Sequence, residues 1–233
     1  MQSLKIHQTL NQAISDYDMS FPTLAIEKSY PFNWNTLTAD EQDMFLQLPE
    51  DFQQFLKSSN GGMLADKRNL FEYEITASFD DGREYHTSSS ELEEFWGYLS
   101  YEHEKPGEDF VYPRAILHEH FDRHLAEEFL PSNVIVIGRC IQNSLIAISI
   151  NKHDYGAIYY WEWYWQYPWY QDFFHTRIET AKSQFSDVKN ILDNPEHPDY
   201  QNAFDALNYA TLIKLAPSFS NFLTLLHEDK EGA

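Results

Sequence analysis

A run from Leu48 to Gly62 contains the sequence signals for both ends of one helix. Pro49 suits the first helical position, where its missing N–H would have no partner in any case. Asn60-Gly61-Gly62 suits a helix end, because asparagine and glycine adopt the left-handed conformation that stops a helix. The run thus predicts a helix whose first turn is acidic, with Glu50 and Asp51. It also predicts that one face of this helix is apolar and buried, with Phe52, Phe55 and Leu56.

The bulk composition is that of a folded protein. The chain has 233 residues, of which 42% are hydrophobic and 16% aromatic, so it can bury a substantial core. Its single cysteine, Cys140, excludes an internal disulfide and fits a reducing compartment. Residues 1–18 show no secretory signal, and no apolar run approaches the length of a membrane span. We therefore expect a soluble cytoplasmic protein.

Net charge is the strongest bulk signal. Sixteen Lys and Arg against 37 Asp and Glu give −21, which disfavours nucleic acid and anionic membranes as partners and favours a basic protein. Between Glu91 and Glu128, eleven acidic residues stand against three basic ones. The simpler interpretation is that the negative charge only keeps the protein soluble.

Periodicity predicts helices first and strands afterwards. Residues 3–17 suit a helix within an irregular lead-in of residues 1–36, and Thr38 with Glu41 forms a capping-box pattern that opens another helix. Residues 70–79 alternate as a strand does, Asp80-Asp81-Gly82 indicates a hairpin turn, and residues 83–87 suit the return strand.

The second half of the chain adds further strands and then helices. Ser90 and Glu93 predict a helix to about residue 99, residues 101–113 an acidic loop, and residues 114–129 another helix. Strands are expected at 134–137, 144–150 and 156–166, and helices at 170–192, 199–214 and 218–227. The predicted fold class is α+β, a mainly antiparallel sheet flanked by helices, with extra helices near the C-terminus.

Three histidines form the most metal-like cluster. His120 and His124 are four residues apart, so both imidazoles would share one helix face, and His118 is close by. The zinc-protease pattern needs glutamate directly after the first histidine of the pair, and Phe121 stands there. A solvated helix face is therefore favoured, and a metal-dependent hydrolase remains the alternative. The sequence has neither a nucleophile elbow nor a glycine-rich phosphate loop, so we expect no catalytic residue, cofactor or metal.

Twelve aromatic residues stand between Tyr155 and Phe174. In a strand, Tyr159, Trp161, Trp163 and Trp165 would share one face, and Tyr160, Glu162, Tyr164 and Gln166 the other. Large aromatic residues at alternating positions are more often core than binding surface. If one face contacts a partner, the better candidates are Tyr160, Glu162 and Tyr164.

These motifs, taken in order, resemble the SUKH superfamily, which includes fungal cell-wall-synthesis regulators and many bacterial immunity proteins. The resemblance rests on Leu48-Pro49, Asn60-Gly61-Gly62, Leu130-Pro131, Ile137-Gly138, Asn143-Ser144-Leu145-Ile146, the run Gly156–Glu162, and Phe219–Leu223. It covers roughly residues 37–228, as a single domain with a helical insertion around 178–217. Asn143-Ser144 departs from the glycine and polar residue that many members carry.

The resemblance implies a protein without catalytic residues that binds and neutralises a cognate toxin domain in the cytoplasm, often a nuclease. A basic toxin would suit the charge of −21. The predicted partner-binding residues in the acidic loop are Glu102, Glu104, Glu108 and Asp109. A regulatory scaffold for a cellular protein is the alternative, and the sequence does not indicate the oligomeric state.

Overall fold

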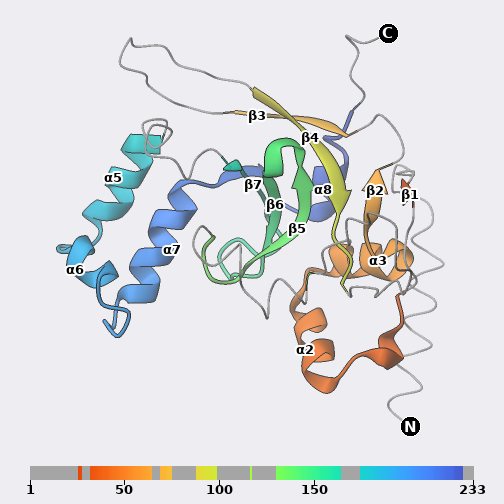
Figure 1. Cartoon of the computed structure of the whole chain (residues 1–233), viewed down its shortest axis with the longest axis horizontal. Coiled ribbons are helices and arrows are strands. Elements are labelled where there is room, and N and C mark those ends of the chain that lie inside the picture. The colour runs from red at the N-terminus through yellow and green to blue at the C-terminus, as the bar shows by residue number, and fades with distance from the viewer. Residues whose placement is uncertain are drawn as a thin grey trace, which may run out of the picture.

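The protein is built on one antiparallel sheet, seen in a computed structural model that describes residues 26–27, 32–64, 69–74, 88–98, 116, 130–163 and 174–227. The strand order is β1-β2-β4-β5-β6-β7-β8, and β3 pairs with β4 beside this path (Figure 1). The strands are β1 (Ile26–Glu27), β2 (Gly62–Leu64), β3 (Leu70–Tyr73), β4 (Ser88–Phe95), β5 (Val134–Cys140), β6 (Leu145–Ser149), β7 (Ile158–Trp161) and β8 (Ile213–Ala216).

Helices flank this sheet, which confirms the predicted α+β class. Helices α5, α6 and α7 lie on one side of the sheet, and α2 and α3 lie toward the opposite side (Figure 1). The helices are α2 (Ala39–Gln47), α3 (Glu50–Ser59), α5 (His175–Ser183), α6 (Val188–Leu192), α7 (Tyr200–Ala210) and α8 (Phe219–Leu223), with short 3-10 turns η1 (Trp34–Thr36) and η2 (Ile141–Asn143). No helix in the described part of the chain is long and apolar enough to cross a bilayer.

The ends of α2 and α3 are those that the sequence predicts. The Thr38 hydroxyl accepts from the N–H of Glu41, and the Glu41 carboxylate accepts from the N–H of Thr38, so the capping box is present. Pro49 is the N-cap of α3, so the helix begins at Glu50, one residue later than predicted. Asn60 ends the helix in the left-handed conformation, with φ 45°. The predicted apolar face is buried at Phe52, Phe55 and Leu56.

Aromatic rings join α3 to the sheet and to α8. Phe55 contacts Phe95 of β4 with ring centroids 5.0 Å apart, and both Phe52 and Phe55 contact Phe219 of α8. The Asp51 carboxylate accepts from the N–H of Ser220 at 2.8 Å and from its hydroxyl at 2.9 Å, so it caps the first turn of α8. Helices α3 and α8 therefore pack as one layer.

The sheet curls strongly. In the strand order, β4, β5 and β6 separate β3 from β7, yet the Tyr73 ring of β3 lies 4.7 Å from the Tyr160 ring of β7. Phe71 lies 5.5 Å from the same Tyr160 ring. The curl brings the inner face of β3 over β7, which buries these aromatic side chains against each other.

The helix predicted to begin at Ser90 is wrong, because residues 88–95 form strand β4. Ser90, Leu92 and Glu94 are buried in strand alternation. Residues of β4 pair with β3 on one edge, β5 on the other, and β2 near its end. Tertiary pairing thus overrides a local capping pattern and the low strand propensity of three glutamates.

The three predicted C-terminal helices differ from the structure. The helix predicted over 218–227 is shorter, because α8 ends at Leu223 and His227 forms a bridge with Leu70. The helix predicted over 199–214 ends at Ala210, and Ile213–Ala216 instead forms β8, which pairs with β7. The helix predicted over 170–192 is divided into α5 and α6, because Asp187 adopts φ −149° and ψ 58°. The predicted helices at 3–17 and 114–129, the turn at 80–82 and the acidic loop fall outside the described residues, apart from helical Ile116.

Candidate functional site

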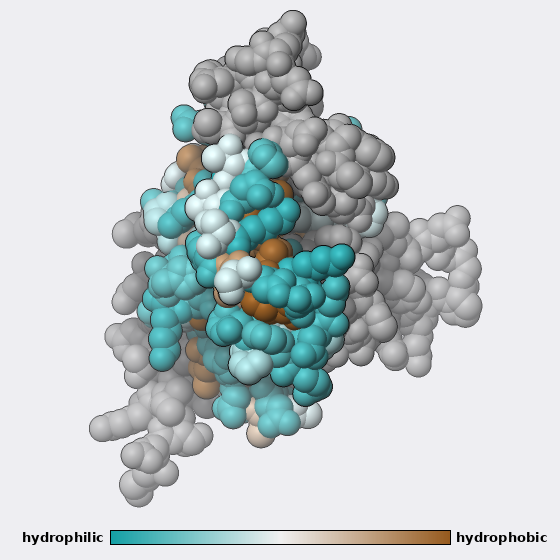
Figure 2. All heavy atoms as spheres, turned by 90° about the vertical axis from the view of Figure 1, so that its left-hand side faces the viewer, coloured by the Kyte–Doolittle hydropathy of each residue, from teal (hydrophilic) through white to brown (hydrophobic). Residues whose placement is uncertain are grey.

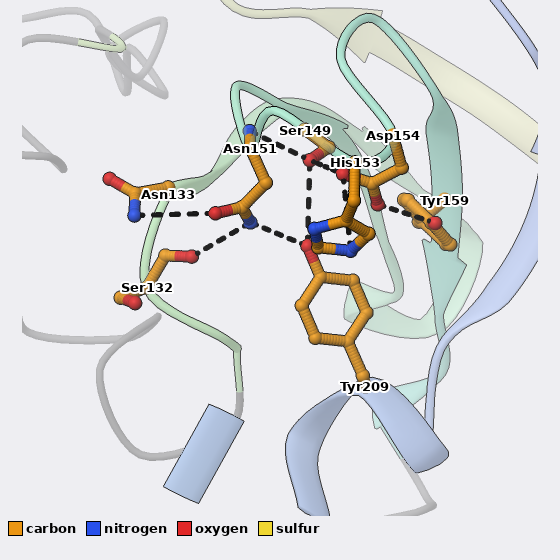
Figure 3. A network of polar contacts seen from close by, with 8 residues as sticks. All are labelled: Ser132, Asn133, Ser149, Asn151, His153, Asp154, Tyr159 and Tyr209. Atoms are coloured by element: carbon orange, nitrogen blue, oxygen red, sulfur yellow. Dashed lines mark hydrogen bonds and ion pairs between the residues drawn. The ribbon is translucent and has the colours of Figure 1, made fainter. Parts of the chain in front are cut away.

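A polar network joins α7 to two loops at the ends of strands (Figure 3). The Asn151 side-chain amide donates to the Tyr209 hydroxyl at 2.5 Å and to the Ser132 carbonyl at 3.2 Å. Ser132 also donates its N–H to the Asp205 carboxylate, at 2.8 Å. Because Asp205 and Tyr209 are four residues apart, one face of α7 holds both loops.

Asp154 organises the β6–β7 loop at the centre of this network (Figure 3). Its carboxylate accepts from the Ser149 hydroxyl at 2.5 Å and from the Tyr159 hydroxyl at 2.7 Å. Burial and the hydrogen bond to Asp154 raise the pKa of Tyr159, and burial raises that of Tyr209.

This network does not form a hydrolytic site. The Ser149 hydroxyl is the one candidate nucleophile at its centre, but Ser149 is fully buried and donates to a carboxylate rather than to a histidine. His153 lies 3.5 Å from Asp154 and packs its ring against Tyr209. The network therefore fixes the position of α7 and of the loop, which is a structural role.

An open groove of about 610 Å³ lies between β3 and β8. Charged and apolar side chains line it together: Glu72, Tyr73 and Glu74 from β3 and the residue after it, Arg177 from α5, Leu212 just before β8, Ile213, Lys214 and Leu215 in β8, and Leu225 after α8. Consecutive residues line it on both sides, so the edges of the two strands face the groove.

Arg177 supports the β8 wall of the groove. Its guanidinium donates to the carbonyl of Leu212 at 2.7 Å and lies 5.2 Å from the Phe174 ring centroid. The Leu212 carbonyl directly precedes β8, so this contact fixes the start of the strand. Sequence reasoning did not find the groove, although the alternation Leu212-Ile213-Lys214-Leu215 is a strand signal that would have indicated β8.

The predicted partner-binding residues fall into three groups. Tyr160 is only 3% exposed, and its hydroxyl lies 3.1 Å from that of Ser90. It is a candidate for partner contact only if its face is exposed, and at this position the face is closed. The cause is the curl of the sheet, which places Phe71 and Tyr73 on that face. Glu162 is half-buried; Tyr164, Glu102, Glu104, Glu108 and Asp109 lie outside the described residues.

Burial raises the pKa of the Glu162 carboxyl, and a hydrogen bond from Tyr73 partly opposes that shift. Glu162 thus lies next to a groove residue. His118, His120 and His124 lie outside the described residues, and within the described ones no three histidine, cysteine or acidic side chains are placed to hold a metal ion.

Hydrophilic residues cover most of the described surface on the α5–α7 side of the molecule (Figure 2). Apolar areas on this face are small and separated by hydrophilic side chains (Figure 2). Within the described part of this face, therefore, no broad apolar surface marks a permanent interface.

Comparison with models of known protein families gives a match over most of the chain. A sequence model of the SMI1 / KNR4 family (SUKH-1) matches residues 31–225, which include every described element from η1 to α8. No curated protein and no solved structure matched the chain. The matched range runs through residues 178–217, for which the helical insertion stays a prediction.

Proposed function

This chain belongs to the SMI1 / KNR4 family (SUKH-1), and from that premise we propose that it is an immunity protein. It binds a cognate toxin domain in the cytoplasm and neutralises it by occupying its surface, without catalysis. The observation that carries the proposal is the net charge of −21 on a member of this family.

The charge favours a basic partner for a physical reason. A strongly negative protein attracts a basic one over several ångströms, which speeds their encounter and weakens as salt screens the charges. A basic nuclease fits this description, because its groove must attract the phosphate backbone. An acidic protein seated there would exclude the substrate.

The direct test is co-expression with the toxin encoded by the adjacent gene. Growth should be rescued, and the two purified proteins should elute as one complex. If growth is not rescued and no complex forms, the proposal is overturned. Recovery of an endogenous partner from cells without any toxin gene would instead support a regulatory scaffold.

The acidic loop gives a sharper test of the docking surface. Reversing the charges of Glu102, Glu104, Glu108 and Asp109 to lysine is expected to slow association and to reduce its salt dependence, with a smaller effect on dissociation. A matched control reverses four exposed carboxylates near α5–α7: Glu179, Asp193, Glu196 and Asp199. Equal slowing in both variants would mean that total charge matters and that this loop is not the surface.

A further inference from the structure

We propose that the groove between β3 and β8 binds an extended segment of a protein partner, which adds a strand to the edge of β8. The segment alternates apolar side chains with polar ones, and basic side chains among the latter face Glu72 and Glu74. The inference deepens the proposed function, since the partner would be the toxin, and it supplies a docking mode that can be tested without the toxin.

The first support is the edge of β8. In the described part of the chain, β8 pairs with β7 on one edge, and no described strand pairs with its other edge. The groove is lined by Leu212 through Leu215 along that edge. An edge with unpaired backbone groups is a template for another strand.

The second support is that the opposite wall already accepts backbone pairing from outside the sheet. Leu70 of β3 donates its N–H to the carbonyl of His227 at 3.1 Å, and His227 donates back to Leu70 at 2.9 Å. This reciprocal pair forms an isolated antiparallel bridge at the start of β3. Beyond it, the edge at Glu72 and Tyr73 faces the groove.

The third support is the alternation of the groove walls. Tyr73 and Ile213 are buried, whereas Glu72, Glu74 and Lys214 are exposed. A strand placed between the two walls would direct every second side chain to the apolar floor and the others to the charged rim. Leu225, which is 40% exposed beside the groove, would be covered by such a strand.

The charge of the β3 rim favours a basic segment on that side of the groove, while Lys214 and Arg177 stand on the β8 side. The β3 rim carries two exposed carboxylates, Glu72 and Glu74, for which no ion pair is present among the described residues. Cross-strand neighbours of opposite charge stabilise a sheet, so lysine or arginine is favoured opposite this rim. A second copy of the same chain is disfavoured, because two proteins of charge −21 repel each other.

The test uses phage-displayed random twelve-residue peptides selected on the full-length protein. Enriched peptides should alternate apolar and polar residues and contain lysine or arginine among the polar positions. Fluorescence anisotropy then measures the affinity of each synthetic peptide. Methylating every second backbone nitrogen should abolish binding if the peptide pairs as a strand.

Variants on the two rims should act in opposite directions. Glu72→Lys combined with Glu74→Lys should weaken peptide binding at least tenfold, whereas Lys214→Glu should strengthen it about two- to fivefold. Glu179→Lys with Glu196→Lys reverses two exposed charges elsewhere and should change the affinity less than twofold. All substituted residues are exposed, so each variant should retain the circular dichroism spectrum of the native protein.

Three results would overturn the inference. The first is that no peptide is enriched. The second is that the enriched peptides bind the β3 variant, Glu72→Lys combined with Glu74→Lys, as tightly as the native protein. The third is that the protein forms a dimer that the β3 variant abolishes. Failure of toxin rescue, with peptide binding intact, would reject the proposed function and leave the groove as a docking site. Rescue that survives the β3 variant would reject the groove and leave the function.

Discussion

The side-chain oxygen of Asn60 accepts a hydrogen bond from the backbone N–H of Tyr98, at 2.7 Å. Asn60 is 1% exposed and its own N–H donates to the carbonyl of Leu56 at the end of α3. One residue therefore stops the helix and also satisfies a buried backbone donor just after β4. The Asn-Gly-Gly motif thus ends helix α3 and also connects it by a hydrogen bond to the segment after β4.

Asn60→Gly should separate these two roles. Glycine keeps the left-handed conformation but removes the acceptor, so the Tyr98 N–H is left buried and unpaired, at a cost of about 1–3 kcal/mol. The control is Asn143→Gly, because Asn143 also has positive φ (62°), and its exposed side chain has no hydrogen-bond partner among the described residues. Urea unfolding measures both, and equal costs would show that the Asn60 side chain contributes nothing beyond its conformation.

Gly61 and Gly156 form a second matched pair. A Cβ added to Gly61 would lie 2.4 Å from the nitrogen of Gly97, whereas at Gly156 the nearest atoms are 3.7 Å away, in Pro49. Both residues have positive φ, so alanine at Gly156 should cost about 1–2 kcal/mol for conformation alone. Gly61→Ala adds a backbone clash and should cost about 3–5 kcal/mol in total. Similar melting temperatures for the two variants would contradict the close approach of α3 to β4.

The hydroxyl of Tyr209 should hold α7 in place. Tyr209→Phe removes the acceptor for Asn151 and is expected to lower the free energy of unfolding by about 1–2 kcal/mol. Amide hydrogen exchange should accelerate in α7 and change little in β5 and β6. Tyr200→Phe is the control, since the Tyr200 ring stacks on Phe204 and its hydroxyl has no partner among the described residues. Unchanged exchange in α7 would show that ring packing alone fixes the helix.

Glu162 should make stability depend on pH. Burial raises the pKa of its carboxyl above the ordinary value, so the native state holds this proton more tightly than the unfolded chain does. The contribution of Glu162 to stability is therefore greatest below the unfolded pKa, about 4.3, and falls as pH rises through the native pKa.

Glu162→Gln removes this titration. The variant should be more stable than the native protein at pH 7, and the difference should shrink toward zero near pH 4. Urea unfolding at a series of pH values measures the difference, with exposed Glu196→Gln as the control. A difference that does not change with pH would mean that the Glu162 carboxyl is not desolvated.

Local signals predicted those parts of the fold that depend on neighbouring residues. The capping box at Thr38 and the stop of α3 at Asn60 each involve contacts within about four residues, and the apolar face of α3 follows from the helical spacing of its side chains. Buried strands β5 and β6 were also predictable, because a short continuous apolar run such as Val134–Ile137 is typical of a strand buried on both faces.

Sequence-distant pairing decided the rest. Residues 88–95 have the local pattern of a capped helix but form a strand, because β3, β2 and β5 supply hydrogen-bond partners. Ile213–Ala216 joins the sheet through β7, more than 50 residues earlier in the chain. A pattern within a few residues does not indicate which distant strand a segment will pair with.

The sequence by itself determined the family, the charge and the helix that ends at Asn60-Gly61-Gly62, since these depend on composition and on short-range contacts. Tertiary structure decided which side chains are accessible. The curl of the sheet buries Tyr160 under Phe71 and Tyr73, and it leaves the edge of β8 facing β3 across a groove. Accessibility follows from how strands far apart in the chain approach each other, which is why residue type and periodicity did not predict it.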